Sequence, residues 1–229
     1  MKKNILITAG GIGKRINAGI PKQFLLLNNI PVLMHTMNVF FHYSNKINIV
    51  LVLPESSFAN WEKLCKKHNF QVSHQLVPGG KTRFHSVKNG LSVINRECLI
   101  AIHDGVRPFV KNEVIKNCFE TAEKLGNAIP VIPINESIRE IINSQNLPAD
   151  RDNFRIVQTP QIFHSSQIKK AYEQDFREGF TDDASVVEST GVKINLVEGN
   201  HENIKITRPK DFIIAEAFLN DSDLLKRNL

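Results

Sequence analysis

Three short runs of this chain are apolar at nearly every position: Ile5–Ile7, Ile47–Leu53 and Cys98–Ile102. A strand with apolar residues on both faces has to be covered on both faces, as in a parallel sheet with helices on each side. We therefore expect an α/β fold in which a mainly parallel central sheet lies between two layers of helices. The 229 residues are enough for a single domain, spanning residues 1–229.

The first apolar run leads directly into a glycine-rich loop, Thr8–Arg15, with the sequence TAGGIGKR. Glycine has no side chain, so the backbone amides of such a loop can approach a phosphate group closely. Two cations flank the loop. Arg15 offers a planar fork of donors, and Lys22 offers a compact charge. This combination favours a triphosphate site over the alternative, an ordinary strand-to-helix turn with a solvated Lys-Arg pair.

The spacing of the glycines argues against two other phosphate-binding motifs. A Walker loop has Ser or Thr after its Gly-Lys pair, whereas Lys14 is followed by Arg15. A dinucleotide fingerprint needs a third glycine where this chain has Ile16, which makes a nicotinamide-dependent enzyme a weaker alternative.

Composition limits the location and the partners. Hydrophobic residues make up 41% of the chain and charged residues 23%, as in a folded soluble protein. The formal charge is +6, but the basic residues are scattered, so we expect small anionic substrates and no nucleic acid. No apolar run is long enough for a membrane span or an export signal. The three cysteines lack metal-ligand spacing, and we expect a cytoplasmic protein.

The rest of the chain alternates between helical and strand patterns. We expect helices at 32–41, 58–67, 112–125, 165–176 and from Pro209 onward, and further strands at 71–77, 128–133, 192–197 and 203–207. Prolines favour sheet edges, so the strand with Pro130 and Pro133 is expected to leave the main sheet.

Residues 134–157 alternate between polar and apolar types around the loop Asn143–Pro148, which is typical of a projecting β-hairpin arm. A two-stranded hairpin is marginally stable by itself in water. We therefore expect the arm to pack on a second copy of the chain and to form a homodimer.

Asp104 follows the apolar run Cys98–Ile102, and Arg107 lies on the same turn. Ligands of open α/β sheets bind at the carboxyl ends of the strands. Asp104 is therefore a candidate ligand of a divalent cation and Arg107 a candidate phosphate contact, although an Asp-Arg pair that stabilises the turn is an alternative. His103 is expected to be structural, because no His or Cys stands at metal-ligand spacing from it.

A second glycine turn, Gly79-Gly80, opens the segment that continues to Val87. It is either a wall for a nucleobase or ribose, or simply a loop and a helix cap. Later in the chain, Thr181 precedes two acids and is a candidate helix N-cap.

Taken together, these segments resemble the family of 2-C-methyl-D-erythritol 4-phosphate cytidylyltransferases over essentially the whole chain. The shared blocks are Ala9–Arg15, Pro21–Gln23, Gly79-Gly80 with Arg83 and Ser86-Val87, His103-Asp104 with Arg107-Pro108, Thr159–Gln161, Thr181-Asp182 with Ala184-Ser185, and Asn203–Lys205 with Thr207–Pro209. The resemblance implies a Rossmann-like nucleotidyltransferase fold. It also implies that the cytidylyl group of CTP is transferred to a branched polyol phosphate, with Mg²⁺ as cofactor and with release of pyrophosphate.

The resemblance further implies roles for individual residues. Arg15 and Lys22 would stabilise the transition state, and Asp104 would serve the metal. The residues implied for the nucleotide are Ala9, Gly10, Gly11, Gly80, Lys81 and Ser86. Those implied for the sugar phosphate are Arg107, Ser137, Arg151, Thr181 and Lys205, of which Ser137 and Arg151 lie on the arm and would reach the neighbouring subunit's site.

Two positions depart from the family pattern. Relatives often have an acidic residue where this chain has Lys81, which leaves the contacts to the base open. Threonine is frequent at the position of Ser137, and serine keeps the hydroxyl group.

The implied reaction agrees with these residue types. The second pKa of a phosphate monoester is about 6, so at neutral pH the acceptor already carries a nucleophilic oxygen, and no general base is needed. What the site has to supply is charge neutralisation and in-line positioning of two anions. Two alternatives stay open: a ribitol 5-phosphate cytidylyltransferase, which shares the fold and most motifs, and a catalytically inactive nucleotide-binding regulator.

Overall fold

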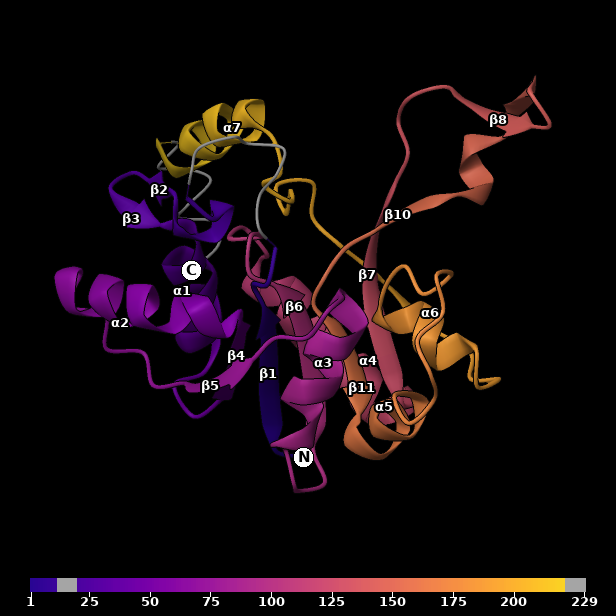
Figure 1. The fold of residues 1–229 in the computed structure, drawn as a ribbon. Helices are drawn as coiled ribbons and strands as arrows, with labels where there is room; N and C mark the ends of the chain where they lie inside the picture. Colours follow the sequence, from indigo (N-terminus) through magenta and orange to yellow (C-terminus); the bar gives the residue numbers. More distant parts are fainter. Residues whose placement is uncertain (12–19, 221–229) are drawn as a thin grey trace.

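The computed structural model describes residues 1–11 and 20–220, and a mixed sheet runs through its centre (Figure 1). Within the described residues this sheet has eight strands in the order β10-β7-β11-β6-β1-β4-β5, with β12 beside β7. The strands are β1 (Lys3–Thr8), β4 (Asn48–Leu53), β5 (Gln75–Pro78), β6 (Leu99–Asp104), β7 (Asn127–Pro133), β10 (Arg155–Val157), β11 (Gln161–His164) and β12 (Leu196–Glu198). The parallel core is confirmed, because β1 pairs in parallel with β4 and β6, and β4 with β5.

The apolar runs form the central strands because both of their faces are buried. Ile5 and Ile7 of β1 belong to one hydrophobic core and Leu6 to the other, and all three side chains are fully buried. The first core is completed by α1 (Val32–Tyr43), α2 (Phe58–Lys67) and α4 (Asn112–Leu125). The second is completed by α3 (Arg83–Ser92), α5 (Ser165–Ala171) and α6 (Asp183–Glu188). The predicted helix-sheet-helix layering is therefore confirmed.

Two glycines explain local features of this packing. Gly126 ends α4 with a φ of 95°, a left-handed conformation that glycine adopts without strain. Gly90 allows α3 to lie close to the sheet, since a Cβ atom there would be 2.5 Å from Leu6 Cδ1. The predicted bounds of α2 and α4 agree with the structure.

Several predicted elements are shorter than expected or absent. β5 contains only Gln75–Pro78, α5 ends at Ala171, and β12 contains only Leu196–Glu198. The strand predicted at 203–207 is wrong. That segment instead crosses the carboxyl edge of the sheet. It is fixed there by a hydrogen bond from the Asn203 side chain to the Thr159 carbonyl (2.8 Å) and by one from the Ile206 amide to the Val106 carbonyl (3.0 Å).

The expectation that the proline-containing strand leaves the main sheet is also wrong. β7 pairs with β11 through Asn127 and Ala128, and with β10 and β12 further along. The carbonyl of Pro130 accepts a hydrogen bond from the Gln158 amide at 2.9 Å. The N–H and C=O of one strand residue point to the same side of the strand. The nitrogen of Pro130 therefore faces the gap between the end of β10 and the start of β11. No sheet hydrogen bond is required at this gap, so the missing N–H of proline is tolerated.

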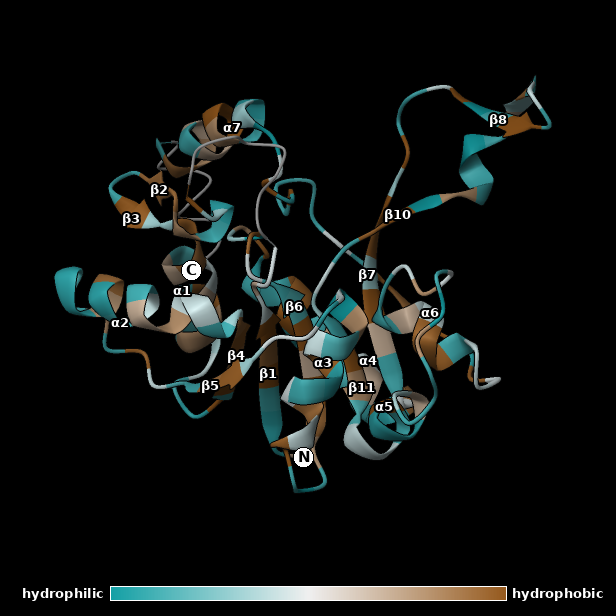
Figure 2. Cartoon of the chain, in the orientation of Figure 1, coloured by the Kyte–Doolittle hydropathy of each residue, from teal (hydrophilic) through white to brown (hydrophobic). Residues whose placement is uncertain are grey.

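The predicted hairpin arm projects from the body (Figure 1). Its strands are β8 (Ile138–Ile142) and β9 (Gln145–Ala149), joined by Asn143 and Ser144 with positive φ angles of 48° and 67°. This turn is tighter than the loop expected at Asn143–Pro148, because β9 already begins at Gln145. Figure 2 shows hydrophobic residues at the far end of the arm, and Ile141 there is 68% exposed.

The C-terminal helix of the described chain, α7 (Pro209–Asn220), begins at the predicted proline and packs near the small hairpin of β2 (Leu26–Leu27) and β3 (Ile30–Pro31). Across residues 1–11 and 20–220, none of the helices combines the length and the apolar character that crossing a bilayer requires.

Candidate active site

A cavity of about 250 Å³ opens at the carboxyl edge of the central sheet. It is bounded by the loop after β1, by the short 3₁₀ helix η1 (Lys22–Phe24), by the turn between β5 and α3, and by the end of β6. Its lining residues are Thr8, Ala9, Gly10, Gly11, Lys22, Gln23, Gly80, Lys81, Thr82, Arg83, Ser86, Asp104, Val106 and Lys205. All the residues expected at the nucleotide therefore line one cavity, which we call the loop cavity. Arg15 lies outside the described residues.

Backbone and amide contacts hold the loop that follows β1. The Ala9 amide continues the sheet by donating to the Val52 carbonyl at 2.9 Å. The side chain of Gln23, which is 1% exposed, donates to the Ala9 carbonyl at 2.7 Å. Gln23 thereby ties η1 to the loop, and this contact places Lys22 at the cavity.

The second glycine turn forms the opposite wall of the loop cavity. Thr82 caps α3 through its side-chain oxygen, which accepts a hydrogen bond from the His85 amide. Ser86 Oγ accepts from the Gly80 amide and donates to the Thr82 carbonyl, both at 3.0 Å. Glycine is required at position 80, because a Cβ atom there would lie 2.4 Å from His85 Cβ. The turn is therefore both a cap and a cavity wall.

Asp104, the last residue of β6, lies among three cationic side chains. Its Oδ2 is 3.0 Å from Lys205 Nζ and 3.1 Å from Arg107 Nε, and its Oδ1 is 3.8 Å from Arg83 Nε. Burial alone would raise the pKa of Asp104, but Lys205, Arg83 and Arg107 outweigh burial and hold that pKa well below its usual range. Asp104 is therefore ionised at neutral pH, and the Asp-Arg pair that the turn allowed is present beside two further cations.

A second cavity, of about 280 Å³, lies beside the first. We call it the side cavity, and its lining residues are Arg83, Asp104, Arg107, Val157, Gln158, Thr159, Gln161, Thr181, Asp182 and Lys205. Arg83, Asp104 and Lys205 line both cavities. The expected sugar-phosphate residues Arg107, Thr181 and Lys205 thus meet at the side cavity, and two hollows rich in positive charge share one wall.

The outer wall of the side cavity is the start of α6. Its N-cap is Asp182 and not the expected Thr181, because the Asp182 carboxylate accepts from the Ser185 amide at 2.8 Å in a capping box. Gln161 binds the same turn twice: Nε2 donates to Asp182 Oδ2 at 2.7 Å, and Oε1 accepts from the Ala184 amide at 2.9 Å. Thr181 therefore precedes the cap and stays exposed at the rim.

His103 and Thr159 lie beneath Asp104. The Thr159 hydroxyl accepts a hydrogen bond from the Asp104 amide at 3.1 Å, so its own proton is directed to His103 Nδ1 at 3.0 Å. The other ring nitrogen of His103 then donates to the Arg107 carbonyl at 3.0 Å. Burial, the largest cause, lowers the pKa of His103 to about 4, so the ring is neutral at physiological pH. This agrees with the expected structural role of His103.

Sequence patterns give no role to Arg83, Gln161 or Asp183, which nevertheless shape the side cavity. Asp183 is fully buried and accepts from Arg83 and from the Tyr172 hydroxyl. Burial and then the charge of Asp183 raise the pKa of Tyr172 well above its usual value. The sequence next to Thr181 gives one indication of the role of Asp183. Two acids follow Thr181, and a single acid is enough to cap the helix, so the second is available for another contact.

Two expected site residues lie away from both cavities. Ser137 and Arg151 are exposed on the arm, where they border a separate hollow that shares no residue with the loop or side cavity. Arg151 donates to the Asn135 carbonyl at the base of the arm.

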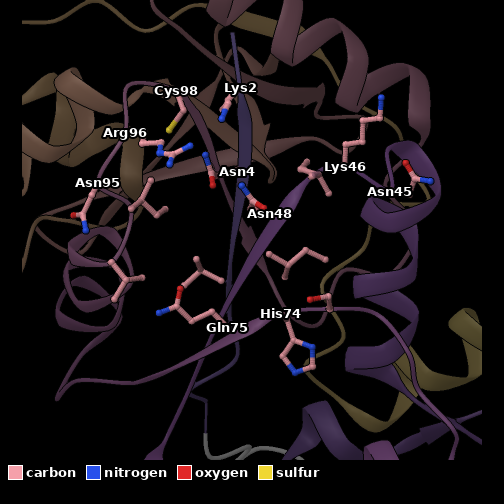
Figure 3. A pocket seen from close by; sticks show the side chains of 16 residues that line it. Lys2, Asn4, Asn45, Lys46, Asn48, His74, Gln75, Asn95, Arg96 and Cys98 are labelled. Atoms are coloured by element: carbon pink, nitrogen blue, oxygen red, sulfur yellow. The ribbon is translucent and has the colours of Figure 1, made fainter.

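A larger cavity, of about 730 Å³, lies at the opposite, amino edge of the sheet (Figure 3). It is lined by amides such as Asn4 and Asn48 and by the exposed cations Lys2, Lys46 and Arg96. It lacks both the glycine turns and the buried carboxylate of the carboxyl edge. Size alone therefore does not identify the functional site, and the carboxyl edge is where open α/β sheets bind ligands.

Comparisons with known proteins indicate the family of this chain. The profile of the family described as 2-C-methyl-D-erythritol 4-phosphate cytidylyltransferase matches residues 4–221. The protein of that name from Bacteroides thetaiotaomicron is 48% identical over 219 residues, which is 96% of this chain and 100% of the relative.

Solved structures are similar over nearly the whole chain. A 4-diphosphocytidyl-2C-methyl-D-erythritol synthase from Anaerococcus prevotii superimposes with a TM-score of 0.81 and 26% identity, covering 95% of this chain and 96% of the other. A 2-C-methyl-D-erythritol 4-phosphate cytidylyltransferase from Thermus thermophilus gives a TM-score of 0.77 and 28% identity, covering 95% and 98%.

Proposed function

We propose that the two cavities bring the substrates of one cytidylyl transfer together, because the chain belongs to the 2-C-methyl-D-erythritol 4-phosphate cytidylyltransferase family. It is thus a nucleotidyltransferase of non-mevalonate isoprenoid biosynthesis. The loop cavity takes CTP, and the side cavity takes 2-C-methyl-D-erythritol 4-phosphate. The products are 4-diphosphocytidyl-2-C-methyl-D-erythritol and pyrophosphate. The observation that carries this assignment is the wall of Arg83, Asp104 and Lys205, which lines both cavities.

The reaction is a displacement at the α-phosphorus of CTP. An anionic oxygen of the acceptor phosphate forms the new bond to phosphorus, and the bond to the bridging oxygen breaks, so that pyrophosphate leaves with the electron pair. The acceptor phosphate is ionised at neutral pH, since its second pKa is about 6, and needs no general base. The task of the protein is to neutralise and align two anions.

The cations of the site divide this task. Lys22 reaches the loop cavity from η1 and is suited to the triphosphate. We assign Arg15, which lies outside the described residues, to the same role. Arg107 borders the side cavity and is suited to the acceptor phosphate. Lys205 borders both cavities, where it can offset charge on the phosphates as they approach. We assign the nucleotide contacts to Ala9, Gly10, Gly11, Gly80, Lys81 and Ser86, and the polyol contacts to Thr181 and its neighbours.

Asp104 fits the Mg²⁺ that this reaction class uses. Among the described residues no group of three or more His, Cys, Asp or Glu side chains is arranged to hold a metal. Mg²⁺ commonly binds one or two carboxylates and takes its other ligands from substrate phosphates and water, so a lone aspartate is sufficient. Asp104 is ionised, and both hydrogen-bonding contacts of its carboxylate use Oδ2. When bound, Mg²⁺ would supply further neutralisation of phosphate charge.

The arm suits a homodimer in which Ser137 and Arg151 complete the acceptor site of the neighbouring subunit. Supporting this proposal, the arm exposes large apolar side chains, among them Ile141, Leu147 and Phe154, and its strands β8 and β9 pair with each other but with no described strand of the main sheet. We place the enzyme in the cytoplasm, because its cysteines, Cys65, Cys98 and Cys118, are free thiols.

The deciding experiment is pyrophosphate release measured with Mg²⁺ and each pair of substrates. We expect turnover with CTP and 2-C-methyl-D-erythritol 4-phosphate, weaker turnover with UTP, and little with ribitol 5-phosphate. Turnover with ribitol 5-phosphate alone would reassign the acceptor. CTP binding without turnover on either acceptor would instead favour the regulator.

A further inference from the structure

Arg83 connects the two walls of the site. It is the first residue of α3 and follows the cap Thr82, so its backbone belongs to the glycine turn that borders the loop cavity. Its side chain reaches the other wall, where Nη1 is 2.9 Å from Asp183 Oδ1 and Nη2 is 2.5 Å from Asp183 Oδ2. This two-pronged pair joins α3 to the start of α6 by side-chain hydrogen bonds, beside the hydrophobic core that the two helices share.

Asp183 is adjacent in sequence to the outer wall of the side cavity. It is the first residue of α6, directly after the cap Asp182 and the rim residue Thr181, both of which line the side cavity. Asp183 is 0% exposed, and its Oδ1 also accepts a hydrogen bond from the Tyr172 hydroxyl at 2.7 Å. The contacts of Asp183 therefore act together with the two hydrogen bonds of Gln161 to fix Thr181 and Asp182 relative to the rest of the site.

The same guanidinium also faces the reacting centre. Arg83 Nε is 3.8 Å from Asp104 Oδ1, the carboxylate oxygen opposite the one that Lys205 and Arg107 contact. A planar guanidinium holds its donors in fixed directions, so its two hydrogen bonds set the orientation of the Asp183 carboxylate, and its charge lies 3.8 Å from Asp104. A lysine ammonium could balance the charge but could not make the two-pronged contact.

We propose that Arg83 is a positioning residue that sets the distance between the nucleotide wall and the acceptor wall, so that the acceptor phosphate lies in line with the α-phosphate of CTP. This inference rests on the proposed function, because it assigns the loop cavity to CTP and the side cavity to the acceptor. Arg83 acts through Asp183, which it holds by two hydrogen bonds, while its charge faces Asp104, and the two substrates meet at the wall that borders these residues.

The test compares Arg83→Lys and Asp183→Asn with the wild-type enzyme. Both variants remove the two-pronged contact while leaving the glycine turn in place. We expect the acceptor KM to rise by about tenfold and kcat/KM for the acceptor to fall by about 100-fold, as small misplacements of reacting groups do. The Kd of CTP should stay near the wild-type value. The double variant should be no worse than either single variant, since both changes break the same connection.

Two controls separate positioning from general damage. Arg96→Lys makes the same chemical change at the amino edge of the sheet and should leave both substrates unaffected. Tyr172→Phe removes one hydrogen bond from Asp183 but keeps the Arg83 pair, so its effect on the acceptor KM should be smaller than that of Arg83→Lys. If Asp183→Asn does not fold, Arg83→Lys measured against these two controls still tests the proposal.

A readout without turnover distinguishes failure of this inference from failure of the proposed function. In a hydrogen-exchange experiment, Arg83→Lys should speed exchange of the amides at 181–188. It should leave exchange of the amides in the loop that follows β1 unchanged. A loss of CTP affinity equal to the loss for the acceptor, or unchanged exchange at 181–188, would overturn the positioning role. Wild-type enzyme that releases no pyrophosphate would overturn the function itself.

Discussion

Lys205 Nζ and Asp104 Oδ2 lie 3.0 Å apart at the carboxyl edge of the sheet. The two side chains differ in accessibility: that of Asp104 is 9% exposed and that of Lys205 is 41% exposed. Asp104 keeps a second close cation in Arg107, at 3.1 Å. Among the described cations around Asp104, Lys205 is therefore the most exposed, and an incoming phosphate can reach it from solvent while the buried carboxylate stays compensated.

Replacing Lys205 should accordingly impair catalysis more than folding. We expect Lys205→Met to lower kcat/KM by about 100-fold or more, because one charged donor that acts on the transition state is removed. Lys205→Arg should recover part of the loss, since the charge remains. Steady-state pyrophosphate release, with unfolding in urea as the stability check, measures both effects. Unchanged kinetics in Lys205→Met would remove Lys205 from the mechanism.

The buried His103 predicts a loss of stability in mild acid. The pKa of His103 is about 4 in the folded protein, chiefly because of burial, against 6.5 for an ordinary histidine. The unfolded chain therefore takes up a proton at higher pH than the folded one. The stabilising contribution is complete above pH 6.5 and is lost as the pH falls from 6.5 to 4. This difference corresponds to about 3 kcal/mol, since each pKa unit is worth about 1.4 kcal/mol.

Urea unfolding at several pH values between the two pKa values tests this. The free energy of unfolding of the wild type should fall steadily across the interval, whereas His103→Gln should show a flatter dependence from a lower starting stability. His201 is exposed, so His201→Gln is the matched control and should follow the wild-type curve. An equally steep curve for His103→Gln would show that other groups cause the acid sensitivity.

Lys22 predicts an effect on the chemical step. It lines the loop cavity beside Gly11, and a Cβ atom on Gly11 would lie 3.6 Å from Lys22 Cε. We expect Lys22→Ala to lower kcat by about 100-fold to 1000-fold, the usual result of deleting one transition-state donor. CTP affinity should fall less than kcat. Single-turnover measurements separate the two, and a wild-type rate for Lys22→Ala would exclude the assigned role.

Sequence patterns predict those parts of the structure that depend on residues close together in the chain. The apolar runs identify β1, β4 and β6 because burial on both faces keeps the middle positions of these strands apolar. Glycines and Asp104 identify the carboxyl edge because loops that approach phosphates need small residues, and strand ends carry the ligands. The cations beside the glycine loop point to Lys22, and the family resemblance adds Lys205, which lines the same cavity although it is distant in sequence.

The features that the sequence does not reveal depend on pairing between distant segments. β7 is well inside the sheet despite two prolines, because the interval between β10 and β11 happens to face Pro130. Segment 203–207 has a strand-like pattern but finds side-chain partners and no ladder. The contact between Arg83 and Asp183 joins two helix starts, and no periodicity in either helix indicates it.

A substitution that disrupts the arm should abolish both the dimer and turnover with the acceptor. Ile141 is 68% exposed near the tip of the hairpin, and Ser137 and Arg151 lie on the same arm, away from the cavities of their own chain. If the arm packs on a second copy, Ile141→Asp should convert dimers to monomers in sedimentation and lower turnover with the acceptor, because a charge would be buried in the interface. Ile213→Asp on α7, where the side chain is 71% exposed, is the matched control and should stay dimeric. A wild-type protein that sediments as a monomer at full activity would show that the acceptor site needs no residue from a neighbour.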